Sequence, residues 1–97
     1  MTVEVRDVPE RHRFEVYDGE QRAGFVTYRL ADGEITFVHT EVDPAFEGKG
    51  LAGQLVKAAL DDVRGRGLQV IPECPYVRRY IDRHPEYADL VPAGSEG

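Results

Sequence analysis

The chain has 97 residues, of which 41 % are hydrophobic and 31 % are charged, and its formal net charge is −6. Such a length and composition are typical of one globular domain. The negative charge argues against nucleic acid as a partner, because phosphate binding needs a basic surface. No apolar run approaches the roughly 20 residues that span a bilayer, and the polar sequence after Met1 does not resemble a secretory signal. We therefore expect one cytoplasmic domain over residues 1–92, no membrane partner, and a disordered tail over residues 93–97.

The chain has a single cysteine, Cys74. One cysteine excludes an internal disulfide and a zinc site built from cysteines, so we expect no metal site. The net negative charge is compatible with a cationic substrate such as an amine.

Residues 3–42 show the alternation of apolar and polar side chains that is typical of half-buried strands. The pairs Asp18-Gly19 and Asp32-Gly33 are suited to tight hairpin turns, which require a positive φ. The predicted strands cover residues 3–6, 13–17, 21–30 and 34–42. The last three, joined by the two Asp-Gly turns, form an antiparallel meander, and residues 3–6 form a separate short strand before Pro9.

The second half of the chain changes to a helical period after a polar loop over residues 43–50. Apolar residues recur every three or four positions up to about Arg66, which predicts an amphipathic helix. A short apolar strand over residues 68–71 follows this crossover helix and is expected to lie parallel to the strand that ends at Val42. Pro75 begins a second helix that runs to about Arg83. The predicted fold class is α/β (α+β): an antiparallel meander, a β-α-β crossover and a short C-terminal helix.

The main chemical signal is the run Glu47-Gly48-Lys49-Gly50-Leu51-Ala52, which lies between a strand and a helix. The first turn of a helix has backbone N–H groups without partners, and the helix dipole adds partial positive charge there. Glycines let a phosphate approach those groups closely, so the run favours binding of a pyrophosphate. The alternative is that the glycines only form a tight turn from strand to helix.

The same glycines also fit the dinucleotide-binding pattern Gly48-x-Gly50-x-x-Gly53, with Glu73 about twenty residues further on. That motif opens directly after a buried strand and needs several β-α-β units to build its crevice. Here a polar loop precedes the glycines and only one crossover follows. We therefore do not expect a dinucleotide site.

Several short segments carry a resemblance to a known family: His39-Thr40-Glu41-Val42, Glu47-Gly48-Lys49-Gly50, Cys74-Pro75 and Arg83-His84-Pro85-Glu86-Tyr87. Over residues 37–91 the chain resembles the GNAT superfamily of acyl-CoA-dependent N-acetyltransferases, in particular its very small members. The superfamily's motif Gln/Arg-x-x-Gly-x-Gly/Ala falls on residues 47–52, with Glu47 at the position of Gln or Arg.

The resemblance implies a minimal GNAT fold and an enzyme that moves an acetyl group from acetyl-CoA to an amine. The backbone amides of residues 48–52 would hold the coenzyme pyrophosphate. Larger members carry extra N-terminal helices that shape the acceptor pocket, and none is predicted here, so the acceptor (a small-molecule amine or a protein amine) stays open. A non-catalytic acyl-CoA-binding or interaction module is the alternative, since a fold does not fix a function.

His39 and Glu41 are the first candidates for catalytic residues. They lie two apart on one predicted strand, so they share a face with Ile35 and Phe37 and lie roughly 7 Å apart, unless a bulge breaks this alternation. A histidine takes up protons near neutral pH, which suits the general base that neutralises the amine. The alternatives are a half-buried structural histidine and a solvated glutamate.

Cys74 lies at the carboxyl end of the strand after the crossover and begins the last helix. The resemblance places it near the acyl group, either as a transient acyl acceptor or as a small wall residue, whereas a free cysteine is often only part of the core. In many GNAT enzymes a tyrosine on this helix protonates the departing thiolate. Tyr80 is the candidate here, and Tyr76 shares its face of the helix. Arg79 is a candidate for binding coenzyme phosphates, with Arg78 beside it.

Overall fold

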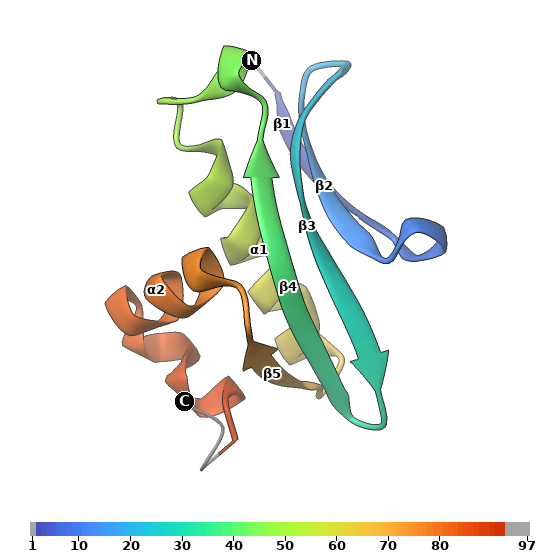
Figure 1. Ribbon diagram of the computed structural model, residues 1–97, viewed down its shortest axis with the longest axis vertical. Coiled ribbons are helices and arrows are strands. Elements are labelled where there is room, and N and C mark those ends of the chain that lie inside the picture. Colours follow the sequence, from blue (N-terminus) through green and yellow to red (C-terminus); the bar gives the residue numbers. More distant parts are fainter. Residues whose placement is uncertain (1, 93–97) are drawn as a thin grey trace.

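Five strands form one mixed sheet in the order β1-β2-β3-β4-β5 (Figure 1). The computed structural model describes residues 2–92. Its strands are β1 (Val3–Val8), β2 (Arg13–Asp18), β3 (Gln21–Ala31), β4 (Glu34–Val42) and β5 (Gln69–Pro72). Neighbours among β1 to β4 pair antiparallel, and β5 pairs parallel to β4. The predicted meander and crossover are confirmed.

Two α-helices follow the meander, and both lie where the sequence predicts them. They are α1 (Leu51–Gly65) and α2 (Pro75–Arg83). Gly67, with φ of +72°, follows the end of α1 in the left-handed conformation that glycine favours. Three short 3-10 helices complete the described chain: η1 (Pro9–Arg11), η2 (Pro44–Phe46) and η3 (Pro85–Leu90). The predicted loop over residues 43–50 therefore contains one helical turn, and the predicted tail over residues 93–97 lies outside the described residues.

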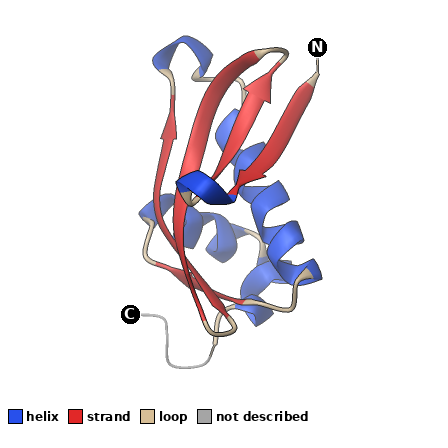
Figure 2. Cartoon of the chain, turned by 90° about the vertical axis from the view of Figure 1, so that its right-hand side faces the viewer, coloured by secondary structure: helices blue, strands red, loops and turns tan. Residues whose placement is uncertain are grey.

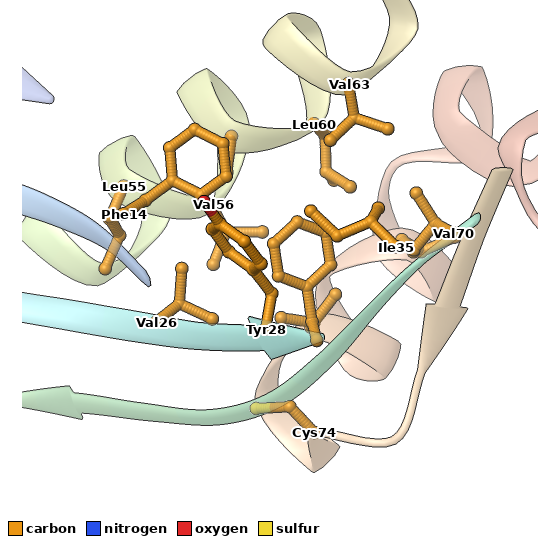
Figure 3. Packing of buried hydrophobic residues seen from close by; sticks show 14 of the residues in the cluster. Phe14, Val26, Tyr28, Ile35, Leu55, Val56, Leu60, Val63, Val70 and Cys74 are labelled. Carbon is orange, nitrogen blue, oxygen red and sulfur yellow. The ribbon is translucent and has the colours of Figure 1, made fainter. Parts of the chain in front are cut away.

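Helix α1 packs on one face of the sheet, and the buried side chains of both layers form the core (Figures 2 and 3). The helix buries six side chains: Leu51, Leu55, Val56, Ala59, Leu60 and Val63. Phe37 and Val26 of the sheet face them and are 1 % and 0 % exposed. Burial of each large side chain contributes about 1.5–3 kcal/mol, so this interface stabilises the position of α1 against β4. The other face of β2 and β3 carries no helix from residues 2–92, and no helix in that range is long and apolar enough to cross a membrane.

A β-bulge interrupts the pairing of β3 with β4 at Val38. Thr27 lies opposite His39, whereas the next residue, Tyr28, lies opposite Phe37. Val38 is therefore the extra residue of β4, and side chains that follow it change faces relative to those that precede it.

This bulge corrects the predicted orientation of His39 and Glu41. Ile35 and Phe37 point into the core, but the His39 and Glu41 side chains are 62 % and 61 % exposed on the opposite face. Thr40 takes the inward position instead and contacts buried Cys74. The prediction that His39 and Glu41 share a face with Ile35 and Phe37 was wrong. One extra residue in a strand moves every later side chain to the other face of the sheet, and the composition of the strand does not show where such a residue is inserted.

Candidate functional site

The glycine-rich run borders a surface hollow of about 310 Å³ at the start of α1. Its wall consists of the run itself, the end of β4 and one aromatic residue of α2. The lining residues are Val42, Phe46, Glu47, Gly48, Gly50, Leu51, Ala52, Gly53 and Tyr76. The crossover from β4 to α1 thus places the predicted pyrophosphate loop beside the end of the strand that carries His39 and Glu41.

Two glycines in this loop have left-handed backbone conformations, with φ of +84° at Gly48 and +73° at Gly50. Side chains other than glycine are strained in this region. A Cβ atom at either position would meet no protein atom within 4 Å. The glycines are therefore required by the backbone, and any side chain added there would extend into unfilled space at the hollow.

The first turn of α1 has backbone amides that no side chain from residues 2–92 caps. Gly50 is the N-cap residue, and the first helical bond runs from the Gln54 amide to the Gly50 carbonyl at 3.2 Å. The amides of Leu51, Ala52 and Gly53 precede that bond and lie at the hollow. Uncapped amides at the positive end of a 15-residue helix have the geometry and partial charge that suit an anion.

Strands β4 and β5 pair only over a short stretch, Glu34–Phe37 with Gln69–Pro72. The last bond between them runs from the Cys74 amide to the Phe37 carbonyl at 2.8 Å, and α2 then leads the chain away from β4. On the other side of β4 the Asp43 amide donates to Ala23 of β3. Because backbone groups alternate along a strand, the amides of Thr40 and Val42 point to the edge of β4 beyond its pairing with β5.

Cys74 lies at the point where β4 and β5 separate. Its side chain is 2 % exposed, and its Sγ atom lies 3.1 Å from Oγ1 of Thr40, within hydrogen-bonding distance for sulfur. Figure 3 shows the sulfur directed over β4. The predicted position of Cys74 at the carboxyl end of β5 is confirmed, and the structure adds Thr40 as its partner.

His39 and Glu41 form a pair on the open face of the sheet. His39 Nε2 lies 3.6 Å from Glu41 Oε2, and the His39 ring packs edge-on against Phe25 at 6.5 Å. Glu41 also borders a second hollow of about 230 Å³ with Phe25 and Asp43. One strand therefore presents Thr40 to Cys74, where β4 and β5 separate, and the His39–Glu41 pair to the opposite face.

Tyr76 and Tyr80 lie on one face of α2, as predicted, and both approach the first turn of α1. A Cβ atom on Gly53 would lie 3.8 Å from Tyr76 Oη and 4.0 Å from Tyr80 Cε2. Tyr76 lines the glycine hollow, whereas the Tyr80 ring stacks on His84 at 3.9 Å. Burial raises the pKa of Tyr80, so its phenol stays protonated at neutral pH.

The remaining predicted coenzyme-binding side chains lie at the rim. Lys49 is directed towards Asp18, with Nζ 4.0 Å from Oδ2, and lies over the ring of Phe46. Glu47 is exposed and lines the glycine hollow, and Arg79 is exposed on α2 beside Tyr76. No group of three or more metal-ligating side chains occurs between residues 2 and 92.

Two residues at this site were not predicted as site residues: Thr40 and Tyr76. Thr40 was missed because its orientation depends on the bulge. Tyr76 was named as a neighbour of Tyr80, but helical periodicity places both on one face and does not say which lines the hollow. Only the packing of α2 on α1 decides this.

Comparison with known proteins identifies the family. The family model described as GCN5-related N-acetyl-transferase matches residues 13–90, which include the glycine loop, β4 and α2. The chain belongs to the GCN5-related N-acetyltransferase (GNAT) family. The mixed five-stranded sheet with its helices is thus a GNAT-like fold.

Named relatives of this GNAT domain match it in part. Protein NATD1 of Xenopus tropicalis is 43 % identical over 47 residues, which are 48 % of this chain and 43 % of that protein. NATD1 of Homo sapiens is also 43 % identical over 47 residues. The chain thus matches less than half the length of these relatives.

Solved structures share the fold. A GCN5-like protein of Staphylococcus aureus is 26 % identical, with a TM-score of 0.70 over 92 % of this chain and 87 % of that one. The ribosomal-protein-S18-alanine N-acetyltransferase of Escherichia coli is 25 % identical, with a TM-score of 0.59, and the match covers 65 % of this GNAT domain and 42 % of that enzyme.

Proposed function

We propose that this protein transfers an acetyl group from acetyl-CoA to an amine. The observation that supports the proposal most is the uncapped start of α1, where the amides of Leu51, Ala52 and Gly53 lie at a hollow next to two glycines. Several convergent N–H groups suit a pyrophosphate better than a single carboxylate. Membership of the GNAT family makes acetyl-CoA the expected donor of that pyrophosphate.

The point where β4 and β5 separate is the proposed position of the thioester. The amides of Thr40 and Val42 are available there to bind the arm of the coenzyme in the manner of an added strand. Thr40 and Cys74 form the inner wall next to the acetyl group, and the buried thiol takes no covalent part in this proposal. Holding both reactants in place is the largest contribution that such a site makes to the rate.

The acceptor amine approaches from the open face of the sheet in this proposal. His39 accepts a proton from the ammonium group, and Glu41, at 3.6 Å, stabilises the resulting imidazolium. The neutral amine nitrogen then attacks the thioester carbonyl, the C–S bond breaks with its electron pair on sulfur, and the new amide nitrogen releases its second proton to solvent. Tyr80 is the proposed proton donor to the leaving thiolate, because its phenol stays protonated at neutral pH.

A non-catalytic acyl-CoA-binding module is the second candidate. Two features favour this candidate. The short turn η1 lies between β1 and β2 where a longer segment could cover the sheet, and no helix from residues 2–92 lies over the exposed face of β2 and β3. No wall of an acceptor pocket is built from those segments. The two candidates share coenzyme binding and differ in turnover.

Incubation with acetyl-CoA and a panel of amines, with free thiol as the readout, separates the candidates. We expect thiol release that depends on one class of amine. Binding of acetyl-CoA without thiol release for any acceptor, and without acetylation of the protein itself, would establish the binding module. A thermal-shift control with acetyl-CoA and NAD checks the ligand, since a ligand at about 100 times its Kd stabilises the fold by about 2.7 kcal/mol.

A further inference from the structure

The first strand of the sheet, β1, has an unpaired edge. It stands at one end of the strand order and pairs with β2 alone among residues 2–92 (Figure 2). The strand at the other end, β5, has four residues and ends at Pro72, whose nitrogen carries no hydrogen. By contrast, β1 has six residues and contains no proline. The exposed backbone groups of such an edge are a template for one more strand.

The pairing of β1 with β2 determines which backbone groups point outward. The Gly19 amide donates to the Thr2 carbonyl at 2.8 Å, so the backbone groups of Thr2 face β2. Backbone groups alternate along an antiparallel strand, and the register of β1 with β2 is regular throughout. The N–H and C=O groups of Val3, Val5 and Asp7 therefore point away from the sheet.

The exposed side chains of β1 carry opposite charges. Glu4 and Arg6 lie on the face of β1 that points away from α1, and their side chains are 53 % and 52 % exposed. Their closest atoms are 2.9 Å apart. Both side chains are open to solvent, so each is able to exchange this partner for a charge on a neighbouring strand.

A second copy of β1 matches the backbone and the charges in one register. A two-fold axis at Val5 places this residue opposite Val5 of the second copy, and Val3 opposite Asp7 of that copy. These residues have outward backbone groups, so they form the hydrogen-bonded pairs of an antiparallel ladder. The same register places Glu4 opposite Arg6 of the second copy, and Arg6 opposite Glu4.

The neighbouring registers are unfavourable. A shift of two residues in either direction keeps the outward groups paired, but it places Glu4 opposite Glu4 or Arg6 opposite Arg6. Opposite charges directly across two strands stabilise their pairing, whereas like charges destabilise it. The charges of β1 therefore select the register with Val5 on the axis.

The other face of β1 has apolar surface that this pairing would cover. Val3 and Val5 are only partly buried and face α1. They border a hollow of about 320 Å³, lined by Val3, Val5, Gln54, Lys57, Ala58 and Asp61. A second β1 brings the Cα atom of its own Val5 to about 5.5 Å from that of the first. Apolar surface that one copy exposes to water is then covered by the other.

We propose that the protein forms a two-fold symmetric dimer in which the β1 strands of two copies pair antiparallel about Val5 and join the two sheets into one. The inference is independent of the proposed function, because no residue of β1 lines the glycine hollow. Dimer formation therefore needs no coenzyme.

Sedimentation velocity of the full chain at about 1 to 500 μM tests the pairing, since an edge-to-edge interface is small and its dimer is expected to be weak. Wild type should shift from a monomer of 10.9 kDa to a dimer as the concentration rises. Glu4→Arg and Arg6→Glu each place like charges opposite one another, and each should raise the dissociation constant of the dimer about tenfold or more. An equimolar mixture of E4R and R6E should form a heterodimer, because two arginines of one chain then face two glutamates of the other.

Two further variants serve as controls. The E4R/R6E double variant exchanges both charges, restores the opposite pairs and should dimerise as wild type does. Asp82→Arg reverses a charge at an exposed position of α2, on the far side of the sheet from β1 (Figure 1), and should leave the dissociation constant unchanged. Circular dichroism verifies that each variant is folded.

Wild type that stays monomeric at every concentration would overturn the dimer and leave the edge of β1 to a strand of another protein. A dimer that forms equally well in E4R and R6E would also overturn it, because such a dimer uses another surface. A mixture of E4R and R6E that forms no heterodimer would refute the register.

Discussion

Thr40 and Cys74 contact each other at the point where β4 and β5 separate, with Oγ1 and Sγ 3.1 Å apart. The contact joins residues 34 positions apart in the chain and exists because the bulge at Val38 turns Thr40 inward. It also places a thiol that is 2 % exposed at the proposed position of the acetyl group. In the proposed mechanism this thiol lies beside the acetyl group and does not accept it.

Replacement of Cys74 by alanine should lower turnover by no more than about tenfold, because direct transfer to the amine needs the cysteine only as a wall. The free energy of unfolding should fall by about 1 kcal/mol for the small cavity. Intact-mass spectrometry of wild type mixed with acetyl-CoA should show no acetyl adduct. An adduct on Cys74, together with loss of all turnover in C74A, would show that transfer proceeds through an acetyl-enzyme.

Gly50→Ala should abolish coenzyme binding. The added methyl group strains a backbone at φ of +73° by about 1 kcal/mol and projects at the anion hollow. Gly33→Ala is a matched control, because Gly33 also has φ of +73°, also has nothing within 4 Å of a Cβ atom, and lies in the hairpin between β3 and β4. The two variants should lose similar stability in urea denaturation. Equal coenzyme affinity of both variants would exclude the glycine loop as the binding site.

His39→Asn should lower kcat by about 100-fold, the usual contribution of a general base, and leave the affinity for acetyl-CoA unchanged. Glu41→Gln should have a smaller effect of a few-fold, because Glu41 acts through His39 at 3.6 Å. Both side chains are more than half exposed, so the melting temperatures should not move. His12→Asn, at an exposed histidine in the β1–β2 turn, is the control. Unchanged kcat in H39N would assign proton removal to another group.

Glu15 should make the stability of this fold sensitive to acid. Burial alone would raise the pKa of Glu15, but hydrogen bonds from Tyr17 and Arg13 outweigh burial, and the pKa is lowered. A lowered pKa gives stability that is complete above the unfolded-state pKa and is lost as the pH falls through the folded-state pKa. Wild type should therefore exceed Glu15→Gln in free energy of unfolding by on the order of 1 kcal/mol at pH 7.

The difference between wild type and E15Q should shrink as the pH falls below about 4, where the protonated carboxyl resembles an amide. Urea denaturation at pH 7 and at pH 3 measures it. A difference that stays constant over this range would mean that E15Q acts through packing rather than through charge.

Local signals in the sequence were sufficient for most of the fold. Asp18-Gly19 and Asp32-Gly33 place both tight turns of the meander, since a turn type depends on two or three residues. Pro75 and Pro85 likewise indicate the bounds of α2, because proline is favoured in the first turn of a helix and disfavours a helical conformation in the residue before it. The uncapped start of α1 was also predictable, because the glycines and the helical period adjoin in the sequence.

The orientation of the site residues was less predictable, because it depends on contacts between distant segments. The bulge at Val38 is fixed by the pairing of β3 with β4, and it decides that Thr40 rather than His39 faces Cys74. Which arginines form ion pairs also depends on contacts between distant segments. Arg64 pairs with Asp89, 25 residues away, and the sequence around either residue does not indicate that pairing.

The central claim is that the first amides of α1 hold the coenzyme pyrophosphate. Titration of ¹⁵N-labelled protein with CoA, followed by amide chemical shifts, tests it most directly. The account predicts saturable shifts that are largest at the amides of residues 48–53, and the loss of those shifts in G50A but not in G33A. Saturable binding that leaves residues 48–53 unmoved and shifts another surface would contradict it.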